Sequence, residues 1–459
     1  KQQYQSAIKL IQDILQVKVK QKEQLEQIRH QQVKFLQGDP TVGHDQLSQA
    51  QEGLLQQIRY EIQRLTECCC SVVFEADVHF VMVNLIRDLR IQGYELRLLQ
   101  EECRNINNPQ VLASIVIEEQ PLSQVIFKTK QTFEPYGVRL ITSTMAPIEQ
   151  CSAVSVFLQA RKDDKSKRKV PNLNNGLIGS VSEMDRMQKR AVFHSLKASV
   201  STSMHMVNNI FTMQIKSQGV VQTLESRPSN TFVVITNESQ WSQAAGKIFM
   251  VEVFAGQDQT QAAWPQVANK LHSIFVTATR QKPQCPTRPL QLYEFKYLRS
   301  KYVRGLDSKL TRNQATALWN WFGPVMQCIR FKRHVCTLWQ KGYIFGFLTK
   351  DTCSSILGMY PAGTFMIRFS ESNPGLFGLA YVEAGENGGQ EVQHYLVKEE
   401  DTGSNKSLPD FIREKSQFVQ LLTLPNLQLL PKDEAFLGLY AKRRRTRGDG
   451  PPVGYSDLK

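Results

Sequence analysis

Hydrophobic residues in the first quarter of the chain recur at helical spacing. The apolar positions step by three or four residues in two stretches, Tyr4, Ile8, Ile11 and Leu15, and then Leu55, Ile58, Ile62 and Leu65. Steps of this size place one apolar stripe on each helix. A further helical pattern runs over residues 83–103, and a short piece follows Pro109.

The break between the first two helices lies in the segment QGDPTVGHD. Gly38, Pro40 and Gly43 interrupt the helical pattern, and Asp45 is a possible cap of the second helix. We therefore predict an antiparallel helical bundle over residues 1–118. It serves either as a partner-binding coiled coil or as a structural spacer.

Short β-rich runs replace the helical pattern from about residue 119 to residue 250. They are separated by Asn, Gly, Ser and Pro and cover residues 123–133, 152–160, 209–218, 219–225 and 231–237. Many short strands at this spacing predict a sandwich or barrel. The run RKDDKSKRK, residues 161–169, holds six basic and two acidic residues, which favours a solvated hairpin loop over a base reader.

The pattern turns helical again over residues 251–340, where tryptophans at four positions predict large core anchors: Trp264, Trp319, Trp321 and Trp339. A compact α/β unit follows over 341–440. The last segment, 441–459, combines a basic run with Gly and Pro and is expected to be an extended tail.

The strand GTFMIRFSES, residues 363–372, carries an unusual arginine. Side chains alternate faces along a strand, so the Phe365 face is predicted to lie in the core and the Arg368 face to be polar. An arginine fork suits two oxygens of a phosphate or carboxylate. Upstream, Thr349 is a plausible helix cap, and Lys350 lies in the first turn, where the helix dipole does not favour a cation. The alternative is that Arg368 pairs with a surface carboxylate.

Composition narrows the class of protein. The 459 residues are enough for three or four domains, and the net charge of +14 favours a polyanionic partner, either nucleic acid or an anionic membrane surface. Nine scattered cysteines without a CxxC pair indicate a reducing compartment and neither a disulfide framework nor a zinc site. No apolar run is long enough to span a membrane, and the missing initiator methionine suggests a fragment.

Signatures of catalysis are missing from the sequence. The position six residues past Cys328 is His334, and six past Cys353 is Met359, so no Cys-x5-Arg phosphatase motif occurs. A P-loop, a kinase Gly-rich loop and a His-Arg-Asp motif are also lacking. We expect a protein that is not an enzyme and that uses neither a cofactor nor a metal.

The strand with its upstream helix and the later segments LPDFIREK and LLPKDEAFLGLY resembles the Src-homology-2 (SH2) domain of the signal transducer and activator of transcription (STAT) family. The resemblance implies that Arg368 binds phosphotyrosine with support from Lys350. It also implies that Ser370, Glu371 and Ser372 form the phosphate-binding loop. His394 either lines the same pocket or is an ordinary strand histidine.

The tail segment PPVGYSDLK resembles the part of a STAT that an upstream tyrosine kinase phosphorylates, which makes Tyr455 the candidate. Family members bind this phosphotyrosine in trans, which implies a two-fold homodimer and movement from the cytoplasm to the nucleus. The run KRRRTR, residues 442–447, is either a nuclear localisation patch or a charged soluble tail.

The middle of the chain resembles the DNA-binding part of the same family. TFVVITNESQW points to Asn237 as a reader of base edges in double-stranded DNA, and Lys128 and Lys130 are candidates for phosphate contact, with a solvated strand face as the alternative. The fold implied is a helical bundle, an immunoglobulin-like β-barrel, a helical connector and an α/β SH2 domain. The 17 glutamines among the first 70 residues suggest a non-animal member, from a slime mould. The alternative function is a phosphotyrosine-binding adaptor without DNA binding.

Overall fold

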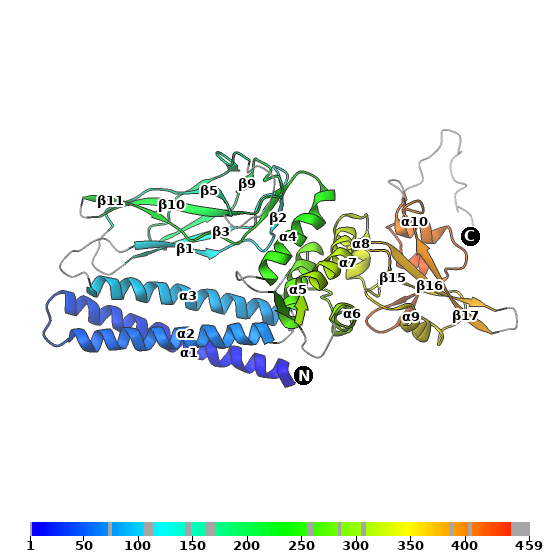
Figure 1. Cartoon of the computed structure of the whole chain (residues 1–459), viewed down its shortest axis with the longest axis horizontal. Coiled ribbons are helices and arrows are strands. Elements are labelled where there is room, and N and C mark those ends of the chain that lie inside the picture. The colour runs from blue at the N-terminus through cyan, green and yellow to red at the C-terminus, as the bar shows by residue number, and fades with distance from the viewer. Residues whose placement is uncertain are drawn as a thin grey trace, which may run out of the picture. The chain divides into compact units, whose positions relative to one another are not determined.

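A computed structural model of the chain describes residues 2–71, 76–104, 113–142, 148–161, 171–217, 219–254, 260–282, 286–303, 309–385, 389–402 and 406–441. It divides into two compact units, Lys1–Gln327 and Cys328–Lys459, which are described one at a time. The first holds a helical bundle, a β-rich part and a helical connector, and the second holds a five-stranded sheet with short helices (Figure 1).

Three long helices form the bundle: α1 (Gln2–Leu36), α2 (His44–Ser71) and α3 (Ala76–Arg104). They lie side by side in Figure 1, and their apolar faces meet in one hydrophobic cluster. The predicted stripe of α2 is confirmed, with Leu55, Ile58 and Leu65 buried.

The stripe of α1 lies one position away from the predicted one. Ala7, Ile11 and Ile14 are buried, whereas Leu15 is 44% exposed. Both series have helical spacing, and the one that packs contains a small alanine that a search for bulky residues passes over. The bundle was therefore predicted correctly, and the face of its first helix in part, since the predicted Ile11 is buried and Ile8 is half-buried.

Two further boundaries differ from the predictions. Helix α2 begins at His44, so Asp45 lies in its first turn instead of capping it, where a carboxylate still suits the helix dipole. The expected continuation of the bundle after Pro109 is wrong, because Ala113–Glu119 forms strand β1 and pairs with β3 (Tyr136–Thr142). The bundle therefore ends before residue 113, not at 118.

Buried glutamines link all three helices of the bundle. The side chain of Gln32 on α1 is fully buried and accepts a hydrogen bond from Gln51 Nε2 of α2 at 2.7 Å. The Nε2 of Gln32 in turn donates to the Leu99 carbonyl at 3.0 Å and to Glu102 of α3 at 2.6 Å. A satisfied polar network inside an apolar core favours one helix register, since any slip leaves buried polar groups unpaired.

The β-rich part contains two larger sheets and two strand pairs. One sheet has the order β1-β3-β8, with β8 at Arg190–Phe193. The other has the order β11-β10-β5-β7, with β4 beside β10, and its strands are Val220–Glu225, Val207–Ser217, Val154–Ala160, Val181–Ser182 and Gln150–Cys151. The pairs are β2 (Val125–Phe127) with β12 (Val233–Ile235) and β6 (Leu177–Ile178) with β9 (Lys197–Ala198).

Both larger sheets contribute to one core. Tyr136 and Phe193 from the first sheet lie 5.3 and 5.2 Å, ring centre to ring centre, from Phe211 of the second. Each sheet keeps two edge strands, so the described strands form open sheets and not the closed barrel that was expected. The immunoglobulin-like fold itself is confirmed by the comparisons reported below.

The connector packs four helices: α4 (Trp241–Val253), α5 (Trp264–Ala278), α6 (Leu292–Tyr302) and α7 (Arg312–Phe331). The short turn η1 (Glu238–Gln240) precedes α4, and β13 (Gln261–Ala263) pairs with β14 (Lys309–Thr311). The four tryptophans predicted as anchors are all buried, three in the connector and Trp339 in the second unit. The helical region starts at residue 241, ten residues before the expected 251.

The second unit is built on a mixed sheet of order β17-β16-β15-β18-β19. Its strands are β15 (Thr364–Phe369), β16 (Phe377–Ala384), β17 (Gln390–Val397), β18 (Gln420–Thr423) and β19 (Gln428–Pro431). Its helices are α8 (Val335–Gln340), α9 (Lys350–Leu357), α10 (Leu408–Arg413) and α11 (Lys432–Ala435). In the described part of the chain, no helix combines the length and apolar character of a membrane span.

Gly246 on α4 generates a test of the connector packing. A Cβ atom there would lie 2.2 Å from Nε1 of Trp319, whose indole donates to the Ser242 carbonyl at 3.1 Å. We expect Gly246→Ala to lower the free energy of unfolding by about 1–3 kcal/mol because the indole must move. Denaturation followed by tryptophan fluorescence measures this.

Gly53→Ala on α2 is the matched control, since nothing lies within 4 Å of a Cβ at that position. This variant should leave the stability unchanged or raise it by up to about 1 kcal/mol, because alanine favours a helix interior. Equal stability of Gly246→Ala and the wild type would contradict the packing described.

Candidate functional site

Arg368 lies on β15, the middle strand of the sheet in the second unit. Every residue of β15 is buried, so the Arg368 face, which was predicted to be polar, is covered as well as the predicted core face. Met366, on the same face as Arg368, packs with Cys353 and Leu357 of α9 in a hydrophobic cluster. Helix α9 covers this face, and Arg368 is only 3% exposed.

The guanidinium of Arg368 has few acceptors around it. Nη1 donates to the Phe369 carbonyl at 3.0 Å and reaches the Leu348 carbonyl at 3.5 Å, and the buried Nε has no partner. Among the described residues, no carboxylate lies within ion-pair distance of it. The alternative of a surface ion pair therefore does not apply. Because arginine cannot lose its proton in a protein, the site retains a buried positive charge that lacks a carboxylate partner.

Gly378 lies directly opposite Arg368 in the pairing of β15 with β16. A Cβ atom at this position would lie 3.2 Å from Cζ of Arg368 and 3.4 Å from its Nε and Nη2. The guanidinium therefore lies against bare backbone. Sequence reasoning missed Gly378, although a glycine inside a strand pattern signals close approach of another group.

The expected start of α9 is confirmed by its cap. The Thr349 hydroxyl accepts from the backbone N–H of Thr352 at 3.1 Å. The backbone N–H of Lys350 donates to a carboxylate oxygen of Glu371 at 3.0 Å. Glu371 thus ties the loop after β15 to the first turn of α9, and two segments 21 residues apart meet at the same place.

The loop after β15 is held by its own hydrogen bonds. Ser370 Oγ accepts from the Asn373 N–H at 3.1 Å, and the Ser370 N–H donates to the Leu376 carbonyl at 2.9 Å. Ser372 is exposed and accepts from the Asn373 side-chain amide at 3.1 Å. Ser370 is buried, so the two predicted serines differ: one shapes the turn and the other faces solvent.

His394 on β17 contacts helix α9. Its Nε2 lies 3.1 Å from the hydroxyl of Ser354 on α9, and its Nδ1 is buried without a hydrogen-bond partner. Burial lowers the pKa of His394, and the positive charges of Arg368 and Lys350 lower it further. Sequence reasoning missed Ser354.

This arrangement suits a tetrahedral oxyanion. Arg368 lies on the strand that leads into the loop of Ser370 and Ser372, and Glu371 joins this loop to Lys350 at the start of α9. A phosphate offers acceptors for cations and hydroxyl groups of this kind. A phosphate dianion would also supply the negative charge that Arg368 lacks among the described residues.

A second candidate site lies at the ends of β2 and β12 in the first unit. These strands are parallel, with Phe127 opposite Ile235, so their carboxyl ends lie together. The N–H of Lys128 donates to the Ile235 carbonyl at 2.9 Å. Lys128 and the exposed Lys130 belong to the turn that follows β2, and Asn237 follows β12 by two residues. The structure therefore places Asn237 close to a turn that carries Lys128 and Lys130, although more than one hundred positions of the chain lie between them.

The loop that carries Asn237 is fixed from one side. Gln240 Oε1 accepts from the backbone N–H groups of Thr236 and Asn237 at 2.9 and 3.3 Å. The Asn237 Oδ1 accepts from the Ser239 hydroxyl at 2.5 Å. Asn237 is exposed, and within the described part of the chain its side-chain NH2 has no acceptor. An exposed asparagine beside lysines is chemically suited to nucleic acid.

Some predicted residues cannot be placed. Tyr455, the run 442–447 and residues 162–169 lie outside the described residues. The last described residues, Tyr440 and Ala441, are held by α10. The Ala441 N–H donates to Asp410 at 2.8 Å, and the Arg413 guanidinium lies 4.5 Å from the centre of the Tyr440 ring.

Comparison with protein families matches four domain models to successive parts of the chain. They are a Dictyostelium STAT coiled coil at residues 8–113, a STATa immunoglobulin-like domain at 113–235, an EF-hand fold domain at 237–332 and an SH2 domain at 343–424. These limits agree with the start of β1 at Ala113.

The EF-hand match concerns the arrangement of helices and not a calcium site. A calcium-binding loop of this fold supplies several carboxylates. Residues 254–263 contain one, Asp258, and residues 303–311 contain one, Asp307. Among the described residues, no group of three or more His, Cys, Asp and Glu could hold a metal.

Curated relatives agree with the domain models. The chain is 34% identical over 433 residues to signal transducer and activator of transcription A of Dictyostelium discoideum, which covers 90% of this chain and 59% of the relative. It is 31% identical over 464 residues to signal transducer and activator of transcription B of Dictyostelium discoideum. This match covers 93% of this chain and 40% of the relative. A shorter match, 34% over 134 residues, joins 29% of the chain to 15% of human signal transducer and activator of transcription 6.

The chain spans less than two thirds of the length of the two Dictyostelium relatives. Its coil and its immunoglobulin-like part are both matched by models of signal transducers of this type, and an SH2 domain follows where the buried arginine lies. The chain therefore belongs to the signal transducer and activator of transcription family, as a member of the slime-mould type.

Proposed function

We propose that this chain is a signal-activated transcription factor that dimerises by exchanging phosphotyrosine tails and then binds double-stranded DNA. The observation that carries the proposal is the buried guanidinium of Arg368, which has no carboxylate partner among the described residues. The names of the relatives, signal transducers and activators of transcription, support the same broad role.

The ligand proposed for the Arg368 pocket is phosphorylated Tyr455 of a second copy. Its phosphate would carry about −1.5 to −2 charge and accept bonds from Arg368 and Lys350. The 14 residues between Tyr440 and Tyr455 reach about 50 Å at about 3.3 Å per residue, so chain length permits exchange. Two reciprocal contacts in one dimer reinforce each other through effective concentration.

An upstream tyrosine kinase would supply the signal, because nothing in the sequence indicates that the chain phosphorylates itself. The phosphorylated dimer would then move from the cytoplasm to the nucleus, with the basic run 442–447 as a candidate address. Neither step involves insertion into a membrane.

The DNA contacts proposed are those of Asn237 and of the turn that holds Lys128 and Lys130. The Asn237 amide would pair with base edges in the major groove, and the lysines would neutralise phosphates. An adaptor that binds phosphotyrosine without DNA is the alternative, and it would have no use for this surface.

We expect kinase-treated wild-type protein to be a dimer in light scattering, and both Tyr455→Phe and Arg368→Ala to be monomers. The first substitution removes the phosphate acceptor, and the second removes its principal charged donor. Lys398→Ala is a matched control, because Lys398 is exposed and no contact of its side chain is recorded in the described residues. If phosphorylated Arg368→Ala protein is still a dimer, the proposed exchange of phosphotyrosine tails is wrong.

Binding of phosphotyrosine should raise the pKa of His394. In the free protein, burial and the charges of Arg368 and Lys350 lower this pKa. A bound dianion offsets both cations, so the protonated imidazole becomes easier to form. NMR titration of the histidine ring with and without a Tyr455 phosphopeptide measures the change. An unchanged pKa of His394 would show that the phosphate binds elsewhere.

The DNA proposal separates base reading from phosphate contact. Lys128→Ala should weaken binding to all duplexes and reduce the slope of log K against log salt by about 0.9 per copy, which is about 1.8 for the dimer. Asn237→Ala should instead cost about 1–3 kcal/mol on the preferred duplex only. Phosphorylated protein would be tested by fluorescence anisotropy on a selected palindromic duplex and a scrambled one. If the phosphorylated dimer forms but binds neither duplex, the adaptor alternative is correct.

A further inference from the structure

A hollow between α2 and α3 carries basic chemistry that the proposed function does not use. It has a volume of about 240 Å³ and lies around Gly93 of α3, where no side chain fills the space. A Cβ there would lie 3.6 Å from Ile58 and 3.8 Å from Leu55, which is ordinary contact, so the glycine opens the hollow without a need to relieve a clash. Its floor is aliphatic and consists of Ile62, which is half-buried, and of Leu55 and Ile58, which are buried in the core of the bundle.

Four arginines line this hollow. Arg59 comes from α2, Arg90 and Arg97 from α3, and Arg227 from the segment after β11. All four are exposed, and Tyr94 holds Arg227 in place, with the guanidinium 4.7 Å from the ring centre. We call this surface, Arg59, Arg90, Arg97 and Arg227 around the aliphatic floor, the arginine hollow.

The positive charge of the arginine hollow is largely uncompensated. Arg59 lies 3.5 Å from Glu52, whose other oxygen accepts from Gln100. Arg90, Arg97 and Arg227 have no carboxylate within ion-pair distance among the described residues. Among the described residues, Glu52 therefore pairs with one of the four arginines, Arg59.

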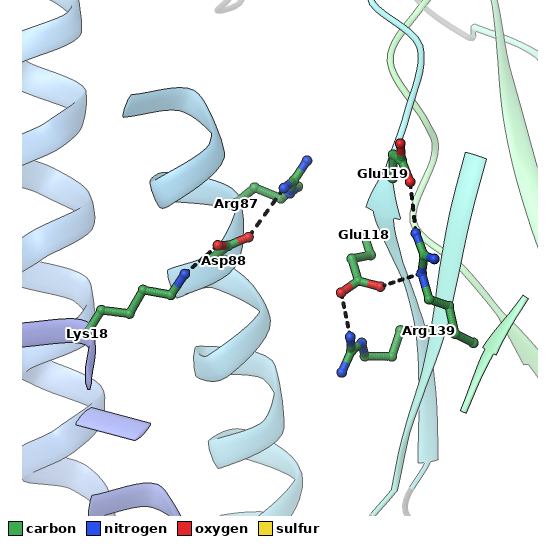
Figure 2. Close-up of polar contacts among 7 residues, drawn as sticks. Lys18, Arg87, Asp88, Glu118, Glu119 and Arg139 are labelled. Atoms are coloured by element: carbon green, nitrogen blue, oxygen red, sulfur yellow. Dashed lines mark hydrogen bonds and ion pairs between the residues drawn. The ribbon is translucent and has the colours of Figure 1, made fainter. Parts of the chain in front are cut away.

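A larger neighbouring hollow of about 1190 Å³ extends the same surface between α3 and β1 and shares Arg90, Tyr94 and Arg227. Two of its acids are paired with arginines: Glu118 binds Arg139 at 2.6 Å and Arg190 at 3.1 Å, and Glu119 binds Arg190 at 2.8 Å. Of its other acids, Glu134 accepts from the Leu122 N–H at 2.6 Å, and Glu225 is exposed. Figure 2 shows these pairs on the β1 side and, on the α3 side, Asp88 between Lys18 and Arg87. The paired acids Glu118 and Glu119 therefore do not neutralise the arginine hollow.

We propose that the arginine hollow binds an acidic peptide segment of a partner protein, in which carboxylates flank apolar side chains. The aliphatic floor takes the apolar side chains, and the arginine rim pairs with the carboxylates. Arg90 and Arg97 are seven residues apart on one helix, which separates them by about 10 Å along its axis. Three residues of extended peptide cover about the same distance.

The shape of the surface favours a peptide over nucleic acid. A duplex is convex and presents phosphates along its outside, so it has no group to fill an aliphatic depression of this size. A membrane surface would likewise need an array of cations without a concave floor. The combination of floor and rim fits side chains of alternating character.

The test measures binding of fluorescein-labelled peptides to the full unphosphorylated chain by anisotropy. The probe is three repeats of Glu-Glu-Leu-Leu, and the comparison peptides are three repeats of Glu-Glu-Ser-Ser and of Lys-Lys-Leu-Leu. We expect the first probe to bind at least about tenfold more tightly than either comparison, since only it matches both rim and floor.

Charge reversal at the rim supplies the second arm. Arg90→Glu and Arg97→Glu should each weaken the first probe by about tenfold. Arg186→Glu is the matched control: Arg186 is exposed on the turn before β8, does not line the hollow, and makes the same change in net charge. The Arg186→Glu variant should bind the first probe with an affinity close to that of the wild type. Circular dichroism checks that all variants fold.

Three results would overturn the proposal. The first is a failure of the Glu-Glu-Leu-Leu probe to bind. The second is equal binding of the Ser-containing peptide or equal loss in Arg186→Glu, which would reveal attraction to net charge alone. The third is displacement of the probe by a DNA duplex in the wild type but not in Arg90→Glu, which would assign the arginine hollow to nucleic acid. None of these results bears on the Arg368 pocket.

Discussion

A guanidinium that cannot lose its proton is the constraint around which the second unit is organised. Removing an ion from water costs several kcal/mol unless partners replace the lost hydration. Arg368 receives two carbonyl contacts, one of them long, while its Nε remains without a partner. Its strand is held between β16 and β18, so the arginine cannot reach water by a shift of the backbone. The cost is therefore built into the fold and is recovered when an anion arrives.

The surrounding residues keep that charge available. Gly378 lets the guanidinium lie against backbone, and Glu371 spends its carboxylate on the first turn of α9 and not on the arginine. A glutamate placed as a direct partner would stabilise the empty pocket and compete with a phosphate. Burial lowers the pKa of His394, and the charges of Arg368 and Lys350 lower it further, so the neutral imidazole is favoured beside them.

Features of this site that follow from local sequence rules could be predicted, and features that depend on tertiary packing could not. Arg368 was found from alternation and residue type, and the start of α9 from the cap chemistry of Thr349, because both depend on local rules. The burial of both faces of β15 could not be found this way, since the second face is covered by a helix whose packing is a tertiary property. Gly378 was missed because its role exists only opposite Arg368. The helical reading after Pro109 failed because the pairing of β1 with β3, a contact between distant segments, decides that segment.

Three surfaces of this basic chain present positive charge, and desolvation distinguishes them. Arg368 is 3% exposed, so its attraction for an anion is weakly screened by salt and demands a close geometric fit. Lys130 and the Asn237 loop are exposed, which suits contacts that act over many phosphates and weaken as salt rises. The rim of the arginine hollow is exposed as well, but its floor is aliphatic, and apolar burial does not decline with salt. The net charge of +14 alone therefore does not predict how strongly each of these sites attracts an anion. Its effect at each place depends on whether water, backbone or apolar side chains surround the cation.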